Sequence, residues 1–164
     1  MNVRKLSAGD LGAYRALHRF GILEAPHGFV DVPETDAARS DADVEAMLSR
    51  GDAWGVFDGN RLVGKLTIDA LPYPSLAHTF WIHAVYVHPD ARGLGASGSL
   101  LRAAIDDAER RGALRVALWV NGANTHALEL YKRIGFRESG RIPGGIKIAE
   151  KLVDDVLMTL EIPR

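Results

Sequence analysis

The segment that decides the fold of this chain lies near its middle and reads Val85-Tyr86-Val87-His88-Pro89-Asp90-Ala91-Arg92-Gly93-Leu94-Gly95-Ala96-Ser97. It ends a run of aromatic and β-branched residues, 79–87, that predicts a strand, and Pro89 stops the strand because it lacks a ladder donor. Apolar residues spaced three and four apart then predict a long helix that closes at Gly112. The turn between them offers unpaired N–H groups at the positive end of a helix dipole, an arrangement that binds phosphate.

Two other interpretations of this turn compete. Residues 93–98 spell Gly-x-Gly-x-x-Gly, the fingerprint of dinucleotide-binding domains. That fingerprint also requires an acidic residue at the end of the next strand, about 20 residues later. Here the next strand ends Trp119-Val120-Asn121-Gly122 and contains no acid. The plainer alternative is a tight turn that only caps the helix.

The hydrophobic pattern on both sides of this segment predicts further strands and helices. Strands are expected at residues 3–6, 53–57, 61–68, 79–87, 114–120, 136–142 and 156–162. Helices are expected after the capping sequence 7–10 up to Phe20, over 40–51, from the glycine turn to Gly112 and over 124–135, with an irregular surface loop at 21–40.

The connections between these elements predict the fold class. Asp58-Gly59-Asn60 between two strands is a hairpin signal and requires antiparallel pairing. The strand–helix–strand unit over residues 79–120 requires a parallel pair with a crossover. We therefore expect one α/β (α+β three-layer) domain over residues 1–164. Its central sheet is mixed and mostly antiparallel, with one parallel pair that splays apart and helices on both faces.

Composition excludes several classes of function. Twenty Lys+Arg against 21 Asp+Glu give a net charge of −1, so there is no bulk attraction to nucleic acid or to an anionic membrane. The absence of Cys excludes disulfides, thiolate metal sites and a Cys nucleophile. His78, His83 and His88 alternate between strand faces, which argues against a metal site. No secretory signal or membrane span is apparent, so we expect a cytoplasmic protein.

Two motifs resemble those of a known family. Arg92-Gly93-Leu94-Gly95-Ala96-Ser97 is similar to the acyl-CoA pyrophosphate loop of the GNAT superfamily of N-acetyltransferases, Gln/Arg-x-x-Gly-x-Gly/Ala, and departs from it at Ser97. One strand later, Asn124-x-x-Ala127-x-x-Leu130-Tyr131-x-x-Ile134-Gly135-Phe136 resembles the family's N-x-x-A-x-x-L-Y-x-x-x-G-F segment. The order of elements matches the family over nearly the whole chain, which implies a GNAT-like fold.

The resemblance implies that acetyl-CoA is the co-substrate. It would lie between the strand ending at Val87 and the strand 114–120, with Val85 and Val87 pairing with the pantetheine arm through their backbones. An N–H near Val87 would polarise the thioester carbonyl. The cofactor-binding residues implied are Val85, Tyr86, Val87, Arg92, Gly93, Leu94, Gly95, Ala96, Ser97, Asn124 and Tyr131.

Catalytic roles also follow from the resemblance. Tyr131 would be the general acid that protonates the leaving thiolate, although its place on an apolar helix stripe also fits a core residue. His83 stands where many members carry a glutamate base, and it could accept a proton directly or through water, or be a structural strand residue. The rivals for the base are His78, Asp31, Glu34 and Asp36.

The loop 21–43 corresponds to the segment in which this family builds its acceptor pocket. The expected substrate-binding residues are Phe29, Asp31 and Glu34, whose acidic members would favour a cationic amine. The predicted reaction is direct transfer of acetyl to a primary amine of a small molecule or peptide within a ternary complex, since no Cys nucleophile exists. The alternative is a non-catalytic acyl-CoA-binding module. Many members form homodimers, and the resemblance extends that expectation to this chain.

Overall fold

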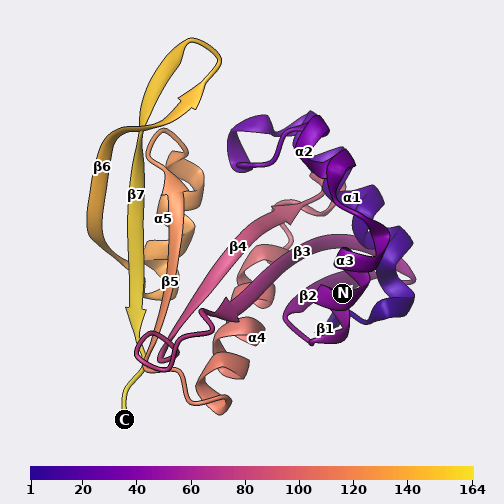
Figure 1. Ribbon diagram of the computed structural model, residues 1–164, viewed down its shortest axis with the longest axis horizontal. Coiled ribbons are helices and arrows are strands. Elements are labelled where there is room, and N and C mark those ends of the chain that lie inside the picture. The colour runs from indigo at the N-terminus through magenta and orange to yellow at the C-terminus, as the bar shows by residue number, and fades with distance from the viewer. The chain divides into compact units, whose positions relative to one another are not determined.

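The computed structural model describes residues 1–164 as a mixed α/β fold (Figure 1). Its helices are α1 (Leu11–Glu24), α2 (Pro33–Ala38), α3 (Asp41–Ser49), α4 (Ala96–Arg110) and α5 (Thr125–Ile134). Its strands are β1 (Asn2–Lys5), β2 (Ala53–Asp58), β3 (Arg61–Ala70), β4 (Thr79–Val87), β5 (Arg115–Asn121), β6 (Arg137–Ile148) and β7 (Lys151–Glu161). The strands form a seven-stranded sheet in the order β1-β2-β3-β4-β5-β7-β6. This mostly antiparallel sheet with one parallel pair, β4 and β5, confirms the predicted fold class.

Two compact units divide the chain. The first unit comprises Met1–Ile68 and Ala84–Ala104, and the second comprises Asp69–His83 and Ile105–Arg164. β4 contributes its beginning to the second unit and its end to the first, and α4 begins in the first and ends in the second. None of the helices combines the length and apolar character needed to cross a bilayer.

The first unit is built from local signals that the sequence carries plainly. The side chain of Asp10 accepts a hydrogen bond from the backbone N of Ser7 at 2.8 Å, which caps the 3-10 turn Ala8–Asp10 that leads into α1. Ser40 accepts from the backbone N of Asp43 at 3.1 Å and begins α3. The hairpin between β2 and β3 turns at Gly59, whose φ of +57° requires the left-handed region.

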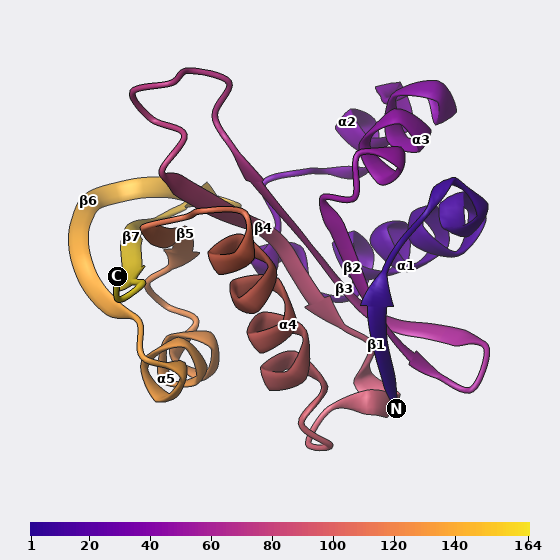
Figure 2. The same ribbon diagram turned by 90° about the horizontal axis from the view of Figure 1, so that it is seen from below.

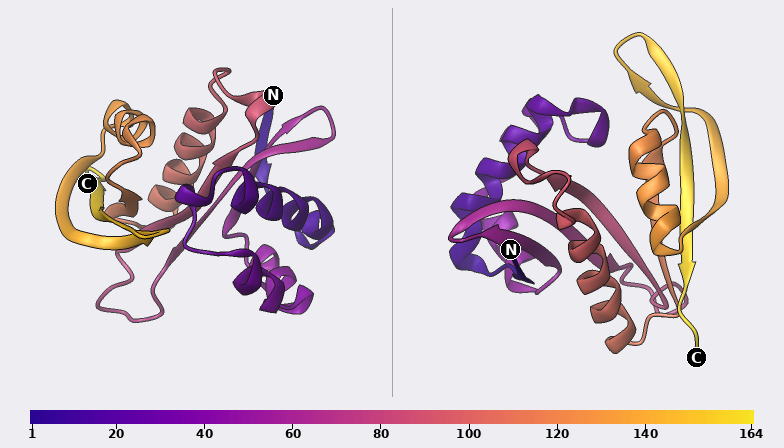
Figure 3. Two further views of the ribbon diagram at one scale, coloured as in Figure 1. Left: turned by 90° about the horizontal axis from the view of Figure 1, so that it is seen from above. Right: turned by 180° about the vertical axis from the view of Figure 1, so that it is seen from behind.

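One apolar cluster joins α1 and α3 to the strands of the first unit. Figures 2 and 3 show α1 and α3 on one side of β1 to β3, with the beginning of α4 on the other. The cluster draws on α1, α3, β2, β3, the end of β4 and the residue that follows β1. Its buried residues are Leu6, Tyr14, Leu17, Val44, Leu48, Ala53, Phe57, Leu62 and Tyr86. At roughly 1.5–3 kcal/mol for each large apolar side chain, this burial is the main force that holds the helices on the strands.

The predicted end of α1 was wrong. Phe20 was expected to be its last residue, but the helix continues through Gly21 to Glu24. Glycine fits at position 21 within the helix because the Cβ of any other residue would lie 2.8 Å from Cζ of Phe29 and 3.1 Å from Cδ1 of Tyr86. The segment expected to be irregular also contains α2, which starts at Pro33, a residue suited to a first helical turn.

The second unit contains the parallel pair and a long hairpin. The parallel ladder joins Thr79–Trp81 of β4 to Arg115–Ala117 of β5. β7 then pairs antiparallel with β5 over Arg115–Asn121, and with β6. Both hairpin strands run beyond the predicted ranges, and Figures 1 and 3 show their tip projecting past α5. A register shift between Ile142 and Ile146 lets β6 continue past Pro143-Gly144-Gly145, beyond the predicted end of the strand at Ile142.

Candidate active site

The predicted phosphate loop lies in the first unit, between a short 3-10 turn, Pro89–Ala91, and the start of α4. Gly93 and Gly95 have φ values of +76° and +80°, which L side chains rarely adopt. Nothing lies within 4 Å of the position that a Cβ would take on either glycine, so it is the backbone conformation that requires them. The turn is open on that side.

The amides of this loop are available to a ligand. Arg92 N donates to Pro89 O at 3.2 Å and Ser99 N donates to Gly95 O at 3.0 Å, but no hydrogen bond is made by the amides between them. These amides belong to the glycine turn and to the first turn of α4, whose N–H groups have no partner within the helix. An array of donors at a helix N-terminus attracts an anion.

Arg92 does not extend freely from the loop. Its guanidinium donates to Glu24 through both terminal nitrogens, at 3.1 Å and 2.7 Å, and its Nε donates to Val87 O at 3.1 Å. The hydrogen bonds from Arg92 and Tyr86 hold the pKa of the Glu24 carboxyl below its usual range, so Glu24 is negative at neutral pH. The cation expected to reach phosphate is therefore already paired.

The end of β4 carries the backbone groups predicted to contact the pantetheine arm. Val85 is half-buried, whereas Tyr86 and Val87 are buried. The ring of Tyr86 packs in the core, and its hydroxyl donates a hydrogen bond to Glu24. Ala84 has a φ of +52°, an unusual value for a residue with a side chain. Lys65, fully buried on β3, donates from Nζ to Ala84 O at 3.1 Å and supports the strand at this point.

His83 lies in the second unit and has a neighbour that the sequence did not reveal. Its imidazole is about half exposed, and Nε2 is 3.3 Å from a carboxylate oxygen of Asp69, at the end of β3. A carboxylate hydrogen-bonded to one ring nitrogen fixes the orientation of the imidazole. The sequence correctly placed no acid on β4 itself, but it gave no local sign of Asp69 because that residue is 14 positions away.

The second motif forms the helix that the sequence predicted. Asn124 Oδ1 accepts from Ala127 N at 3.1 Å, which caps α5, and Gly135 ends it with a φ of +119°. Tyr131 is buried, its ring lies 5.8 Å from that of Phe136, and burial raises its pKa to about 12. The phenol therefore keeps its proton at neutral pH and is available as a proton donor.

The three residues predicted to bind the acceptor substrate differ in burial and in their contacts. Phe29 is partly buried and packs with its ring edge against His18 at 5.3 Å. Asp31 accepts from His18 Nε2 at 3.0 Å and lies 3.6 Å from Arg39, so its charge is shared within the first unit. Glu34 is exposed in the first turn of α2.

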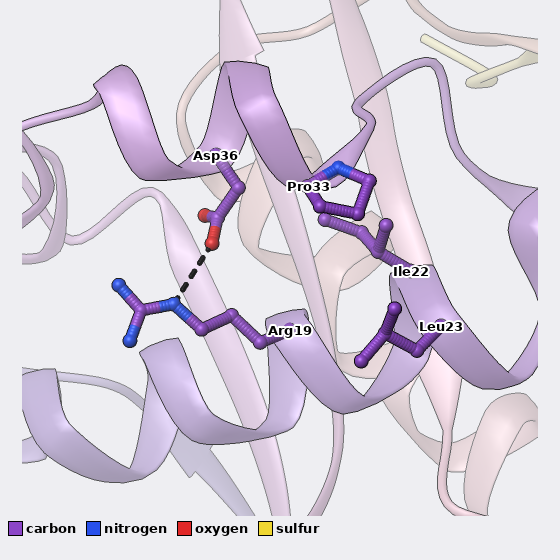
Figure 4. A pocket seen from close by; sticks show the side chains of 5 residues that line it. All are labelled: Arg19, Ile22, Leu23, Pro33 and Asp36. Carbon is purple, nitrogen blue, oxygen red and sulfur yellow. Dashed lines mark hydrogen bonds and ion pairs between the residues drawn. The ribbon is translucent and has the colours of Figure 1, made fainter.

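A small pocket lies between α1 and α2 (Figure 4). Arg19 and Asp36 face each other across it with Nε 3.0 Å from a carboxylate oxygen, and Ile22, Leu23 and Pro33 form its apolar side. Its volume is about 130 Å³, well below the roughly 300–1,000 Å³ of most ligand pockets. It can take a small side chain and no coenzyme.

Comparison with known proteins decides the family. The model of the acetyltransferase (GNAT) family matches residues 19–136, which include the loop, His83 and Tyr131. The chain belongs to the GNAT acetyltransferase family. The match confirms the resemblance, and acetyl-CoA is the co-substrate with which acetyltransferases of this family work.

Curated relatives of this GNAT chain match it over part of its length. The L-amino acid N-acyltransferase MnaT of Escherichia coli is 34% identical over 100 residues, covering 61% of this chain and 48% of MnaT. The L-methionine sulfoximine/L-methionine sulfone acetyltransferase of Pseudomonas aeruginosa is 36% identical over 61 residues, covering 37% of this chain and 36% of the relative. The chain thus spans about half or less of the length of these relatives.

The fold of a solved GNAT structure covers the whole chain. A putative acetyltransferase from Salmonella typhimurium, solved with its cofactor acetyl-CoA, superposes with a TM-score of 0.85 at 19% sequence identity. The likeness covers 100% of this chain and 95% of the other. At this level of identity the two proteins share the fold.

Proposed function

We propose that this protein transfers the acetyl group of acetyl-CoA to the primary amino group of a free amino acid or a close analogue. The observation that carries the proposal is the row of unpaired amides over residues 93–98 at the start of α4. Such a row suits the diphosphate of coenzyme A, because its donors need an anion and the helix dipole adds positive potential. Membership in the GNAT family identifies the anion as part of an acyl-CoA.

The chemical step is a direct displacement. The neutral amine nitrogen attacks the thioester carbonyl carbon and forms a tetrahedral intermediate with an oxyanion and a positively charged nitrogen. The nitrogen loses one proton as the carbon–sulfur bond breaks, so that the amide forms and the thiolate of CoA leaves and is protonated to the thiol. A backbone N–H near Val87 stabilises the oxyanion. The absence of Cys leaves no thiol to carry an acetyl intermediate, which favours attack within a ternary complex.

His83 is the proposed general base. An ammonium acceptor must lose a proton before it attacks, and histidine is the side chain that exchanges protons near neutral pH. Support comes from Asp69, whose carboxylate oxygen lies 3.3 Å from Nε2 and holds the imidazole ring in place. Asp69→Asn keeps the shape of this pair and removes the charge, so it should lower kcat while the Kd for CoA stays the same.

Tyr131 is the proposed donor to the leaving sulfur. With a pKa of about 12 it would transfer its proton to a thiolate of pKa about 8.5 only at a cost of roughly 5 kcal/mol. A hydrogen bond from the phenol to the thiolate is therefore the main contribution, and full transfer follows when other charges offset that cost.

The acceptor class is supported by the curated relatives, which are named for acylation of L-amino acids and of methionine sulfoximine and sulfone. Their acceptors share an α-amino group beside a carboxylate. The expected contacts of Glu34, Asp31 and Phe29 with an acceptor stay predictions. The expected homodimer also stays a prediction, and light scattering on the purified protein would measure its oligomeric state.

The test mixes the purified protein with acetyl-CoA and a panel of amines, and measures free thiol. The panel contains L-methionine sulfoximine, the common L-amino acids, simple amines without a carboxylate, and peptides with a free N-terminus. We expect thiol release with amino acids and little with simple amines. Binding of CoA by calorimetry without release on any amine would instead favour the non-catalytic acyl-CoA-binding module. No binding of CoA at all would refute the proposal itself.

A further inference from the structure

The pairing of Arg92 with Glu24 connects the phosphate loop to the end of α1. The two carboxylate oxygens of Glu24 each accept one terminal nitrogen of Arg92, in the parallel fork geometry that guanidinium and carboxylate groups form. The third nitrogen, Nε, donates to Val87 O at the end of β4. All three nitrogens of the guanidinium are thus engaged within the first unit.

Tyr86 contacts both members of the Arg92–Glu24 pair. Its hydroxyl donates to Glu24 Oε2 at 2.8 Å, and its ring lies 5.8 Å beneath the Arg92 guanidinium. Burial, with Glu24 adding to the effect, raises the pKa of Tyr86, so the phenol remains a donor. The ring of Phe29 lies 5.6 Å away and packs against it. Glu24 therefore accepts from two side chains that are 62 and 68 positions away in the sequence.

The segment that follows Arg92 needs such an anchor. Gly93 and Gly95 are free to adopt many backbone conformations, and holding both at positive φ costs conformational entropy. The amides of residues 93–98 make no hydrogen bond that would restrain it, and only Arg92 N, at its start, is bonded, to Pro89 O. The side chain of Arg92, at the first position, is hydrogen-bonded to α1 and to the end of β4.

We propose that Glu24, together with Tyr86, is a positioning residue for coenzyme binding. It holds the Arg92 guanidinium across the end of β4, and so fixes the backbone of residues 92–97 in the form whose amides receive the diphosphate. Glu24 itself does not touch the ligand. This inference rests on the proposed function, because it assigns how the same loop is kept ready for coenzyme A.

The opposite role for Glu24 would be competition. In that case the carboxylate would hold Arg92 back, and its removal would free a cation for the phosphate. The geometry opposes this role, because freeing Arg92 breaks its bonds to Glu24 and Val87 and leaves a carboxylate facing a diphosphate. The two roles predict effects of opposite sign, which makes the distinction experimental.

The experiment measures CoA binding by calorimetry in the wild type and in Glu24→Gln, which keeps the shape of the side chain and removes its charge. We expect the Kd for CoA to rise about five- to tenfold. The activity with S-acetylpantetheine, which lacks the diphosphate, should stay unchanged. Glu138→Gln is the matched control, because Glu138 forms a similar fork with Arg141, at 2.9 Å and 3.2 Å, on the exposed β6. Its Kd should equal that of the wild type.

A double-mutant cycle shows whether Glu24 acts through Arg92. In an Arg92→Met background, Glu24→Gln should leave the Kd for CoA unchanged. An additive effect would overturn the proposal, and so would tighter CoA binding by Glu24→Gln or an equal loss with S-acetylpantetheine. Tyr86→Phe, which removes one bond to Glu24, should weaken CoA binding by a smaller factor. Failure of the wild type to bind CoA would contradict the proposed function instead.

Discussion

The buried lysine of β3 makes the stability of this protein depend on pH in a predictable direction. Lys65 is fully buried, and its ammonium contacts Ala84 O and the faces of two rings, Tyr14 at 5.0 Å and Phe29 at 5.4 Å. Burial lowers its pKa from 10.5 to about 7. The native protein therefore loses this proton far below the pH at which the unfolded chain loses it.

The magnitude follows from linkage. Because the native pKa is the lower one, the unfolded chain binds more protons between pH 7 and 10.5, and stability rises with pH across that window. The slope approaches about 1.4 kcal/mol per pH unit for one proton. From pH 7.5 to 9.5 the free energy of unfolding should increase by about 2 kcal/mol through Lys65 alone.

Urea denaturation at pH 7.5, 8.5 and 9.5 measures this effect in the wild type and in Lys65→Met, which keeps the length of the side chain without a titrating group. The difference between the two free energies of unfolding should change by about 2 kcal/mol over the series, in favour of the wild type at high pH. Lys132→Met removes an exposed lysine and should show no such change. Parallel pH curves for the wild type and Lys65→Met would refute the reasoning.

Two further predictions concern packing and chemistry. Gly12 and Gly21 lie on the same helix, but only Gly21 has close neighbours, so Gly12→Ala should stabilise by about 0.5–1 kcal/mol and Gly21→Ala should be about 1–3 kcal/mol less stable than Gly12→Ala in urea melts. Equal effects would mean that Phe29 and Tyr86 move aside at little cost. Tyr131→Phe should lower kcat about 100-fold in the thiol-release assay while the Kd for CoA is unchanged. Normal turnover in that variant would remove Tyr131 from the mechanism.

The elements of this fold were predictable where their signals are local. The bounds of β4, 79–87, were predicted to the residue, because Pro89 and the glycines that follow leave no other end for the strand. Ser40 and Asn124 each accept a hydrogen bond from a residue three positions later, and Gly135 ends its helix by its own conformation. The hairpin of β6 and β7 was underestimated, since its length depends on pairing with another strand.

The candidate site divides along the same line. The sequence alone determined the fold class, the glycine turn and the helix that carries Tyr131, because each depends on contacts within a few residues and on hydrophobic period. Only the tertiary structure decided that Arg92 is held by Glu24, that His83 has Asp69 beside it, and that Lys65 supports Ala84. These partners are 14 to 68 positions apart, and side chains meet across such separations only after the strands and helices have packed. No local sequence pattern therefore indicates these side-chain contacts.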